Sequence, residues 1–332
     1  MKLASRRLGQ TRVQVTTLGL GTASLAGNMA PVGEGTARTI IDEAFDNAIR
    51  YVDTAPYYGY GKSEHAVGDG LRHRTGWTLS TKVGRLLAPR RGPQAKGDQW
   101  RTPYPFQDVF EFSYDSIMRS YEDSLQRLGL NHVDILYIHD IDVPLAKEEN
   151  PRATYRKWVK SAYKALDELR RNGDVRAIGF GVNVTQPIAD ALDLGQWDAF
   201  LLAGRYTLLE QAPLASLFPA VKKHGASIVV GGPFNSGILA GGATFNYAKA
   251  PAAVVARVKK IAAVCASHGV PLAAAALQFP VANPIVSSII PGPRAPEELK
   301  QILGWWETRI PASLWSDLKN EGVLDPAAPT PK

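Results

Sequence analysis

Short apolar runs alternate with amphipathic stretches along most of the chain. Eight runs are short and largely apolar or β-branched, as in strands covered on both faces; they span residues 17–20, 51–53, 78–82, 133–138, 177–182, 199–202, 227–230 and 286–290. Stretches with helical spacing lie between them, at 36–48, 113–128, 155–171, 251–268 and 296–305. Repeated strand–helix alternation indicates a parallel sheet, and eight strands close a barrel. We expect an α/β fold, the (β/α)8 TIM barrel.

Four segments add detail to this repeat. Asn172-Gly173-Asp174 is a helix stop, because Gly accepts the left-handed position after the last turn. Residues 5–16 form an N-terminal β-hairpin, turned at Gly9-Gln10, that can plug the barrel bottom. Residues 83–112, rich in proline and aromatic residues, are expected to be a long βα loop, and such loops are usually functional or disordered. We expect one domain over 1–332, with a loose tail at about 323–332.

Composition narrows the class of protein. Hydrophobic residues make up 45% and charged residues 21%, which is ordinary globular usage. The single cysteine, Cys265, excludes an intrachain disulfide and a cysteine-based zinc site, and the six histidines form no metal motif. We expect a cytoplasmic protein with no metal, because the N-terminus lacks the apolar run of a secretory signal and no apolar run reaches a membrane-spanning length.

The net charge of +7 does not by itself indicate a partner. The basic doublets lie far apart and are not interleaved with aromatic residues on one element, so no nucleic-acid partner is expected. A small-molecule partner, a sugar or an aldehyde, is expected instead, and the oligomeric state stays open.

Titratable side chains stand where the predicted strands end, which is where parallel barrels place their chemistry. Asp53, Lys82 and His139 come at or directly after three neighbouring strands, and Tyr58 lies on the loop after Asp53. A tyrosine near pKa 10 is a poor base at neutral pH, and we expect Lys82 to lower the pKa of Tyr58. Asp53 would hold Lys82, and His139 would hydrogen-bond a substrate oxygen.

Each of these residues has a plainer interpretation. Tyr58 and its neighbour Tyr57 could both be packing residues, Asp53 and Lys82 a structural ion pair, and His139 a core histidine. Asp140, beside His139, suggests a metal ligand, but adjacent side chains on a strand diverge, which argues against one.

The order of these motifs resembles the aldo-keto reductase superfamily. The resemblance is carried by Tyr-Val-Asp-Thr-Ala-Pro-Tyr-Tyr-Gly at 51–59, Ser-Thr-Lys-Val at 80–83 and Asp-Ile-Leu-Tyr-Ile-His at 134–139. Within that superfamily, residues 121–130 and 181–183 are similar to the sugar 1-dehydrogenases, which act on L-fucose, L-galactose and D-threo-aldoses, and to pyridoxal 4-dehydrogenase. The resemblance implies hydride transfer with a nicotinamide cofactor, with Tyr58 as acid–base residue.

The resemblance also implies a cofactor site. Its expected contacts are Gly21, Thr22, Asn183, Pro233, Gly237, Leu239, Pro291, Gly292 and Arg294. Two positions depart from the superfamily: Gly231 stands where many relatives have an aromatic residue against nicotinamide, and Ala203 or Gly204 where a glutamine is expected. Glu298 stands where NADP-preferring relatives have arginine, so we favour NAD over NADP, although Arg294 argues the other way.

The resemblance favours oxidation of an aldose hemiacetal at C1, from sugar to lactone. Pyridoxal 4-dehydrogenase activity and general aldehyde or ketone reduction are alternatives. Two further classes stay open: a Schiff-base lyase that uses Lys82 as nucleophile, and a non-catalytic nicotinamide-binding accessory protein.

Overall fold

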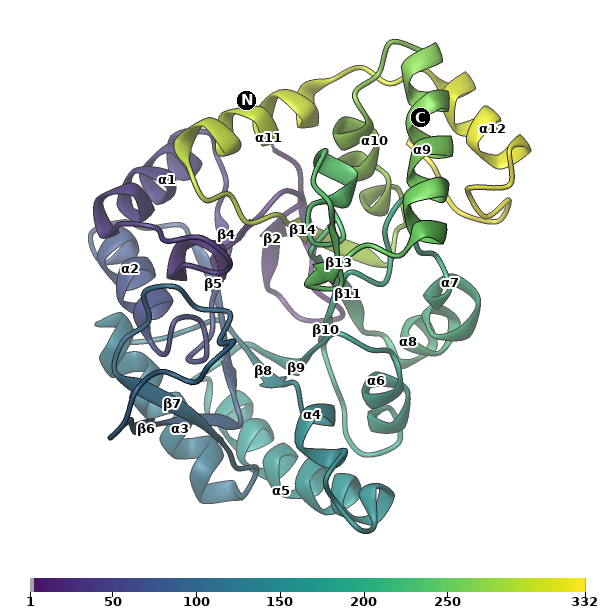
Figure 1. The fold of residues 1–332 in the computed structure, drawn as a ribbon. Coiled ribbons are helices and arrows are strands. Elements are labelled where there is room, and N and C mark those ends of the chain that lie inside the picture. Colours follow the sequence, from purple (N-terminus) through teal and green to yellow (C-terminus); the bar gives the residue numbers. More distant parts are fainter. Residues whose placement is uncertain (1–2, 332) are drawn as a thin grey trace.

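Eight parallel strands form the centre of the computed structural model, which describes residues 3–331 (Figure 1). In spatial order they are β3 (Leu20–Gly21), β4 (Tyr51–Asp53), β5 (Thr78–Val83), β8 (Ile135–His139), β9 (Ala177–Val182), β10 (Ala199–Ala203), β11 (Ser227–Gly231) and β14 (Val286–Ile290). The last strand meets the first, because Leu18 bridges Ile289 in parallel and the Gly19 amide donates to the Ile289 carbonyl at 2.9 Å. The expected (β/α)8 barrel is confirmed.

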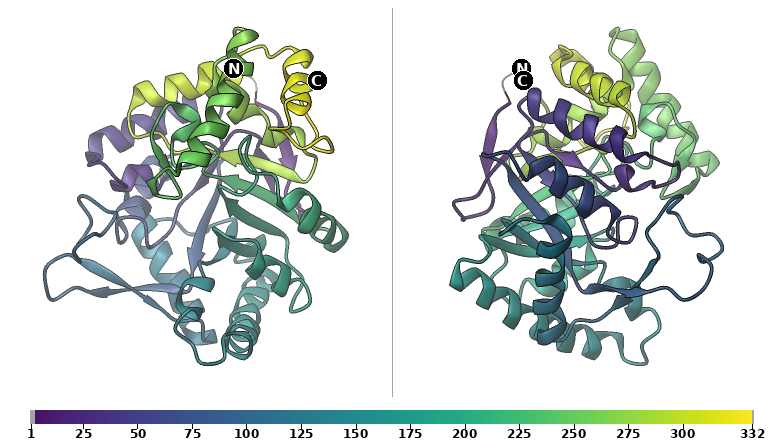
Figure 2. Two further views of the ribbon diagram at one scale, coloured as in Figure 1. Left: turned by 45° about the vertical axis from the view of Figure 1, so that its right-hand side comes forward. Right: turned by 90° about the vertical axis from the view of Figure 1, so that its left-hand side faces the viewer.

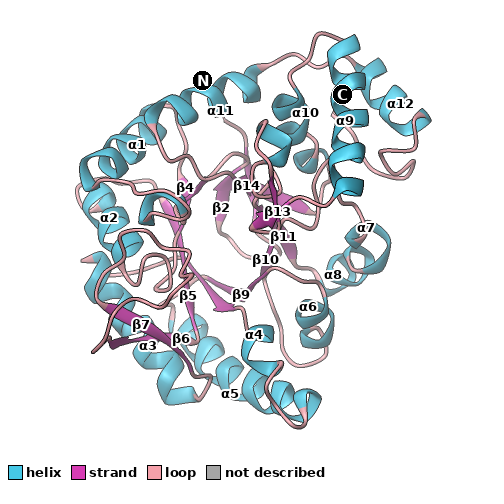
Figure 3. Ribbon diagram, viewed as in Figure 1, coloured by secondary structure: helices cyan, strands magenta, loops and turns pink. Residues whose placement is uncertain are grey.

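Helices surround the barrel and cover the outer face of its strands (Figure 3). The longer ones are α1 (Glu34–Asp46), α2 (Lys62–Leu71), α3 (Tyr114–Leu128), α5 (Pro151–Asn172), α9 (Ala252–Ser267), α11 (Pro296–Glu307) and α12 (Ala312–Asn320). The shorter ones are α4 (Asp142–Leu145), α6 (Gln186–Ala191), α7 (Pro213–Ser216), α8 (Phe218–His224) and α10 (Leu272–Gln278). Gly173, at φ 84°, ends α5 as expected. No single helix among the described residues is long and apolar enough to cross a membrane. Ala252–Ser267 and Leu272–Ala282 pass that test only together, as a pair bent by 100°.

The N-terminal hairpin closes the bottom of the barrel, at the opposite end from the strand carboxyl ends. β1 (Ser5–Arg7) pairs antiparallel with β2 (Gln14–Thr16), and Leu8, Val13 and Val15 pack in one buried cluster with side chains from the barrel interior. Gly9 at the turn has φ 55°, and a Cβ there would lie 2.3 Å from the Asp198 carbonyl oxygen. Only glycine fits this approach.

Residues 83–112 are not the plain loop expected from their prolines. β6 (Arg85–Pro89) and β7 (Phe106–Phe110) pair antiparallel over five residues each, and the ribbon projects beyond the barrel (Figure 2). Pro89 and Pro105 lie at the far end of this ribbon, where a missing ladder hydrogen bond is tolerated. The proline content therefore predicted a loop where the chain forms a hairpin, which starts two residues after β5.

Three expected boundaries also differ. The first strand is shorter and later than 17–20, and the fourth runs to His139 because His139 pairs with Gly181 of β9. The tail is not loose over the described residues 323–331. Leu324 and Ala328 are buried, the Arg257 guanidinium donates to the Val323 carbonyl at 3.1 Å, and Lys332 lies outside the described residues. A further hairpin, β12 (Thr244–Phe245) with β13 (Ala248–Lys249), follows β11.

Candidate active site

A buried lysine lies at the centre of the carboxyl-end face of the barrel. Lys82 Nζ donates to Asp53 Oδ2 at 2.7 Å, to the Thr54 carbonyl at 2.8 Å and to the Tyr58 hydroxyl at 3.1 Å. Its side chain is 1% exposed. An ammonium has three N–H donors, so each one has an acceptor and the charge is held in one orientation. The structure thus brings together three of the four expected side chains.

Asp53 is held from its other side as well. Ser80 on β5 donates to Asp53 Oδ1 at 2.7 Å, and its hydroxyl lies 3.0 Å from the Tyr51 hydroxyl. Burial raises the pKa of Asp53, whereas Lys82 and Ser80 lower it. Sequence reasoning missed Ser80 as a contact, although it precedes Lys82 by two residues and therefore points to the same face of the strand.

The pKa of Tyr58 does not follow the expected direction. Burial, followed by the carboxylate charges of Asp53 and Asp140, raises the pKa of this phenol well above its usual value of 10.0. The expected fall in the pKa of Tyr58 is wrong, because desolvation of the phenolate and the nearby carboxylates outweigh the effect of nearby cations. The Tyr58 hydroxyl is therefore protonated at neutral pH.

His139 is buried beside Tyr58, with ring centroids 5.8 Å apart in an edge-on arrangement. Burial, together with the charges of Arg85 and Lys82, lowers the pKa of His139 well below 6.5, so the imidazole is neutral. Its Nδ1 makes no hydrogen bond within residues 3–331. A neutral imidazole carries one N–H donor, which suits a hydrogen bond to an uncharged substrate.

An ion-pair cluster behind His139 was not foreseen. Arg85, the first residue of β6, contacts Asp140 at 2.8 Å and Asp108 at 2.7 Å, and its guanidinium lies 3.4 Å from the centre of the Tyr57 ring. Asp140 has φ 45°, a turn that brings its carboxylate to 3.5 Å from His139 Nε2 instead of diverging as expected. Burial raises the pKa of Asp140 to about 6, and Arg85 opposes this. No cluster of metal-ligating side chains occurs in the described part of the chain.

A cavity of about 630 Å³ extends from Asp53 and Tyr58 toward the start of α11. Six of the expected cofactor residues line it: Gly21, Thr22, Pro233, Gly237, Gly292 and Arg294. Three others do not belong to its lining. Leu239 is fully buried, and the Pro291 carbonyl accepts from the Gly21 amide at 3.0 Å. The Asn183 amide donates to Asp140 Oδ1 at 3.1 Å, next to His139.

Comparison with known proteins places this geometry in a family. The sequence profile of the Aldo/keto reductase family matches residues 17–320. The chain belongs to the aldo/keto reductase family. It is 42% identical to a pyridoxal 4-dehydrogenase from Microbacterium luteolum, with 96% of this chain and 97% of the relative covered. It is 34% identical to a D-threo-aldose 1-dehydrogenase from a Pseudomonas species, with 96% of each covered.

A solved structure agrees with this assignment. The holo form of an aldo-keto reductase from Bacillus halodurans superposes with a TM-score of 0.72 at 25% identity, covering 96% of both chains. Aldo/keto reductases use nicotinamide cofactors, and the glycines of the cavity lining fit such a group. Gly232 and Gly237 line it, and a Cβ on either would find no atom closer than 3.7 Å. The backbone here is open to the close approach of a pyrophosphate.

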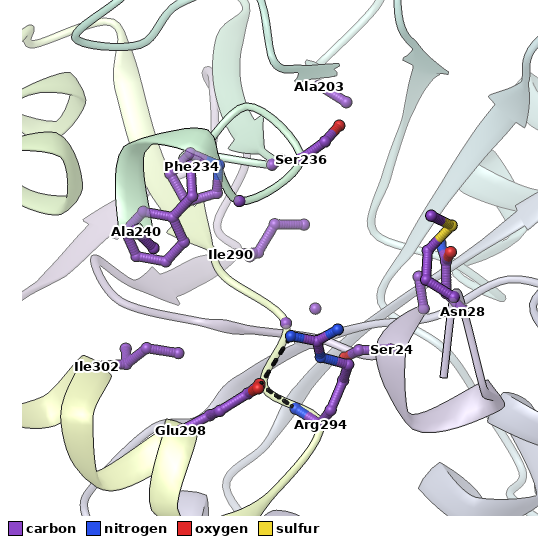
Figure 4. Close-up of a pocket in the computed structure, with 18 of the residues that line it drawn as sticks. Ser24, Asn28, Ala203, Phe234, Ser236, Ala240, Ile290, Arg294, Glu298 and Ile302 are labelled. Carbon is purple, nitrogen blue, oxygen red and sulfur yellow. Dashed lines mark hydrogen bonds and ion pairs between the residues drawn. The ribbon is translucent and has the colours of Figure 1, made fainter. Parts of the chain in front are cut away.

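An ion pair lies at the far end of this aldo/keto reductase cavity. The Arg294 guanidinium lies 3.0 Å from Glu298 Oε1, and the Arg294 amide donates to Glu298 Oε2 at 2.8 Å (Figure 4). Phe234 and Trp305, which also line the cavity, pack edge to face at 5.6 Å. The two rings thus give this end of the cavity an apolar lining.

Proposed function

We propose that this aldo/keto reductase is an NAD-dependent dehydrogenase that oxidises a cyclic hemiacetal to a lactone. The observation that carries the proposal is the chain of contacts from Asp53 through Lys82 to the Tyr58 hydroxyl, beside a neutral His139 at one end of the cavity. When bound there, the nicotinamide supplies the hydride acceptor. The other tasks fall to the side chains.

Tyr58 is the proposed acid–base residue. As the hemiacetal carbon gives up its hydride, the hydroxyl on that carbon loses its proton to Tyr58 and the carbonyl bond of the lactone forms. Lys82, held by Asp53 2.7 Å away, stabilises the phenolate that must accept this proton. His139 donates a hydrogen bond to the same oxygen and fixes its approach. In the reverse direction the protonated Tyr58 acts as the acid.

The hemiacetal assignment rests on what the relatives' substrates share. Aldoses close to cyclic hemiacetals, and pyridoxal does so too, because its hydroxymethyl group lies beside its aldehyde. Identity is higher to the pyridoxal 4-dehydrogenase than to the D-threo-aldose 1-dehydrogenase, at 42% against 34%. Aromatic rings also surround the reacting end: Trp100 contacts Tyr57 at 5.2 Å and Tyr58 at 5.8 Å between centroids. These favour pyridoxal as the first substrate to test.

The cofactor assignment rests on Glu298. Its carboxylate already neutralises Arg294, the cation at the far end of the cavity. A 2′-phosphate would meet this carboxylate and be repelled, whereas a ribose hydroxyl can hydrogen-bond it. NAD is therefore favoured over NADP.

The Schiff-base alternative has less support. All three hydrogens of the Lys82 ammonium are donated, and a nucleophilic amine must lose one of its protons. The accessory-protein alternative leaves unexplained why a protonated phenol, a buried cation and a neutral imidazole converge at one end of the cavity.

The test is growth of reduced-nicotinamide absorbance with NAD+ or NADP+ and a panel of pyridoxal, L-fucose, L-galactose and a D-threo-aldose. Faster reduction of NAD+ with pyridoxal or an aldose is expected. If no hemiacetal is oxidised but simple aldehydes oxidise NADPH, the protein is a general carbonyl reductase. Glu298 then does not select NAD over NADP.

A further inference from the structure

Two exposed apolar side chains stand at the cavity that the proposed reaction uses. Five large hydrophobic side chains are exposed among residues 3–331: Met29, Val109, Val143, Val184 and Tyr247. Only Met29 and Tyr247 of these five line the cavity, at 43% and 55% exposure. Neither side chain belongs to the hydrophobic clusters of the core.

The same two residues have unfavourable backbone conformations. Met29 has φ 66° and Tyr247 has φ 63°, in the left-handed region that bulky side chains rarely adopt. The other three exposed apolar residues do not share this feature within the described chain. Strained non-glycine residues concentrate at ligand-binding positions, where the surrounding structure holds them in place. For Tyr247 the two-residue β12–β13 turn accounts for this value, because Asn246 beside it has φ 48° and such turns need a positive φ at both residues. The position of both side chains at the cavity is therefore what singles out the pair.

Each of the two residues is fixed by contacts of its own segment. The Met29 amide donates to the Gln99 carbonyl at 3.1 Å, which ties it to the β6–β7 excursion next to Trp100. Tyr247 is at the turn of the β12–β13 hairpin, and its amide donates to Ser236 Oγ at 3.0 Å. The rim of the cavity is thus built from two separate excursions of the barrel.

Tyr247 reaches toward the reacting end. Its hydroxyl lies 3.5 Å from Asn183 Oδ1, and Asn183 in turn donates to Asp140 beside His139. The ends of β10 and β11, which line the cavity, carry almost no side chain, because they are Ala203 and Gly231. A Cβ on Gly231 would already lie 3.2 Å from Leu201 Cδ2, so no ring fits there without movement. An aromatic surface over the ends of β10 and β11 must come from another segment, and Tyr247, which lines the same cavity, provides one.

We propose that Tyr247 and Met29 are substrate-binding residues, forming an apolar rim that grips a flat ring and makes this site select aromatic carbonyls and hemiacetals over small aliphatic ones. The inference rests on the proposed function and narrows it, since it ranks pyridoxal-like substrates above simple aldehydes. A ring face and a thioether both make favourable contacts with a flat aromatic ligand.

The test compares pyridine-4-carbaldehyde with propanal, each reduced with NADH by the full-length enzyme. The measured quantity is the ratio of the two kcat/KM values. Tyr247→Ala and Met29→Ala are each expected to lower this ratio about five- to tenfold, the loss expected for one aromatic contact. Tyr247→Phe keeps the ring and is expected to hold the ratio within about twofold.

Val109→Ala is the matched control, because Val109 is as exposed as Met29 yet lies away from the cavity lining. If the ratio is unchanged in both Tyr247→Ala and Met29→Ala, or falls equally in Val109→Ala, the proposed substrate-binding role of Tyr247 and Met29 is wrong. Hemiacetal oxidation by the wild-type protein is measured separately. If the wild type oxidises no hemiacetal but the ratio still falls in Tyr247→Ala and Met29→Ala, the proposed function is wrong and the substrate-binding role of the two residues is kept. If the wild type reduces neither aldehyde, both are overturned.

Discussion

Tyr58 is protonated at neutral pH, and this determines how the activity should depend on pH. Burial raises its pKa even though Lys82 lies 3.1 Å from its hydroxyl. The acid form needed for carbonyl reduction is therefore abundant at neutral pH, while the base form needed for oxidation is scarce. The two directions of one reaction should respond to pH differently.

Oxidation is expected to speed up as the solution becomes more alkaline. Below the pKa of Tyr58, the phenolate fraction grows about tenfold for each pH unit, so log kcat/KM should rise with a slope near one above neutrality. The rate of aldehyde reduction should stay nearly constant over the same pH range.

Tyr58→Phe should abolish turnover and leave the Kd for NADH, measured by fluorescence, unchanged. A flat oxidation profile, or loss of NADH binding in the variant, would contradict the assignment.

Asp140 should set an acidic limit on activity. Its pKa, raised to about 6 from 3.8, means that it gains a proton as the pH falls below about 6 and weakens its pair with Arg85. The expected kcat/KM profile declines below that pH, and Asp140→Asn should remove the decline.

The contribution of Asp140 to folding stability should rise as the pH falls, opposite to its effect on activity. A carboxyl whose pKa is raised by folding binds its proton more tightly in the folded state, so protonation between about pH 6 and 4 favours folding at this site. Thermal melting across that window separates the two effects. An activity loss that tracks unfolding would show that Asp140 is not its cause.

The sequence predicted the site residues at strand ends better than those in turns. Asp53, Lys82 and His139 converge because parallel strands end at one face, and that rule needs only the pattern of apolar runs. Asp140 was placed wrongly because a left-handed non-glycine residue has no local signal. The pKa of Tyr58 depends on burial, which depends in turn on loops the pattern does not describe.

Among the elements, the β6–β7 hairpin contributes most to the site beyond the bare barrel. It supplies Arg85, which pairs with Asp140 and Asp108 and lies against the Tyr57 ring. Eight strands and the main helices follow from hydrophobic periodicity. This hairpin did not, because a two-stranded ribbon that is only half-buried shows no clear alternation and carries prolines at its end.

Removing the charge of Arg85 should change both stability and the acidic limit. In Arg85→Gln, the buried carboxylate of Asp140 loses its cation, and breaking such a pair costs about 3–5 kcal/mol of unfolding free energy. The pKa of Asp140 should rise further, which moves the acidic decline in kcat/KM toward neutral pH. Chemical denaturation and the pH profile measure the two effects. Arg91→Gln, at an exposed position of the same excursion, is the control; if it behaves like Arg85→Gln, the cluster has no special role.

For the whole molecule, the chemistry and the N-terminal hairpin lie at opposite ends of one barrel. Leu8 is fully buried in the bottom cluster. Leu8→Ala should lower the free energy of unfolding by about 2–5 kcal/mol, the usual cost of such a cavity. At temperatures where the variant remains folded, kcat should equal that of the wild type. Arg12→Ala, exposed at the same turn, should change neither. A large fall in kcat at unchanged stability would mean that the two ends are coupled.

Closure of the barrel has a consequence for how the chain is made. The Arg6 guanidinium donates to the Val286 carbonyl across 280 residues, and Ser287 Oγ donates to the Arg7 carbonyl. β3 pairs early with β4, but its other edge is closed only when β14 has been synthesised. Until then a nascent chain holds an open sheet with an unpaired edge at β3, the kind of edge that invites aggregation. Ribosome-bound fragments that end before residue 286 should therefore depend on chaperones, and release of the last strand should end that dependence.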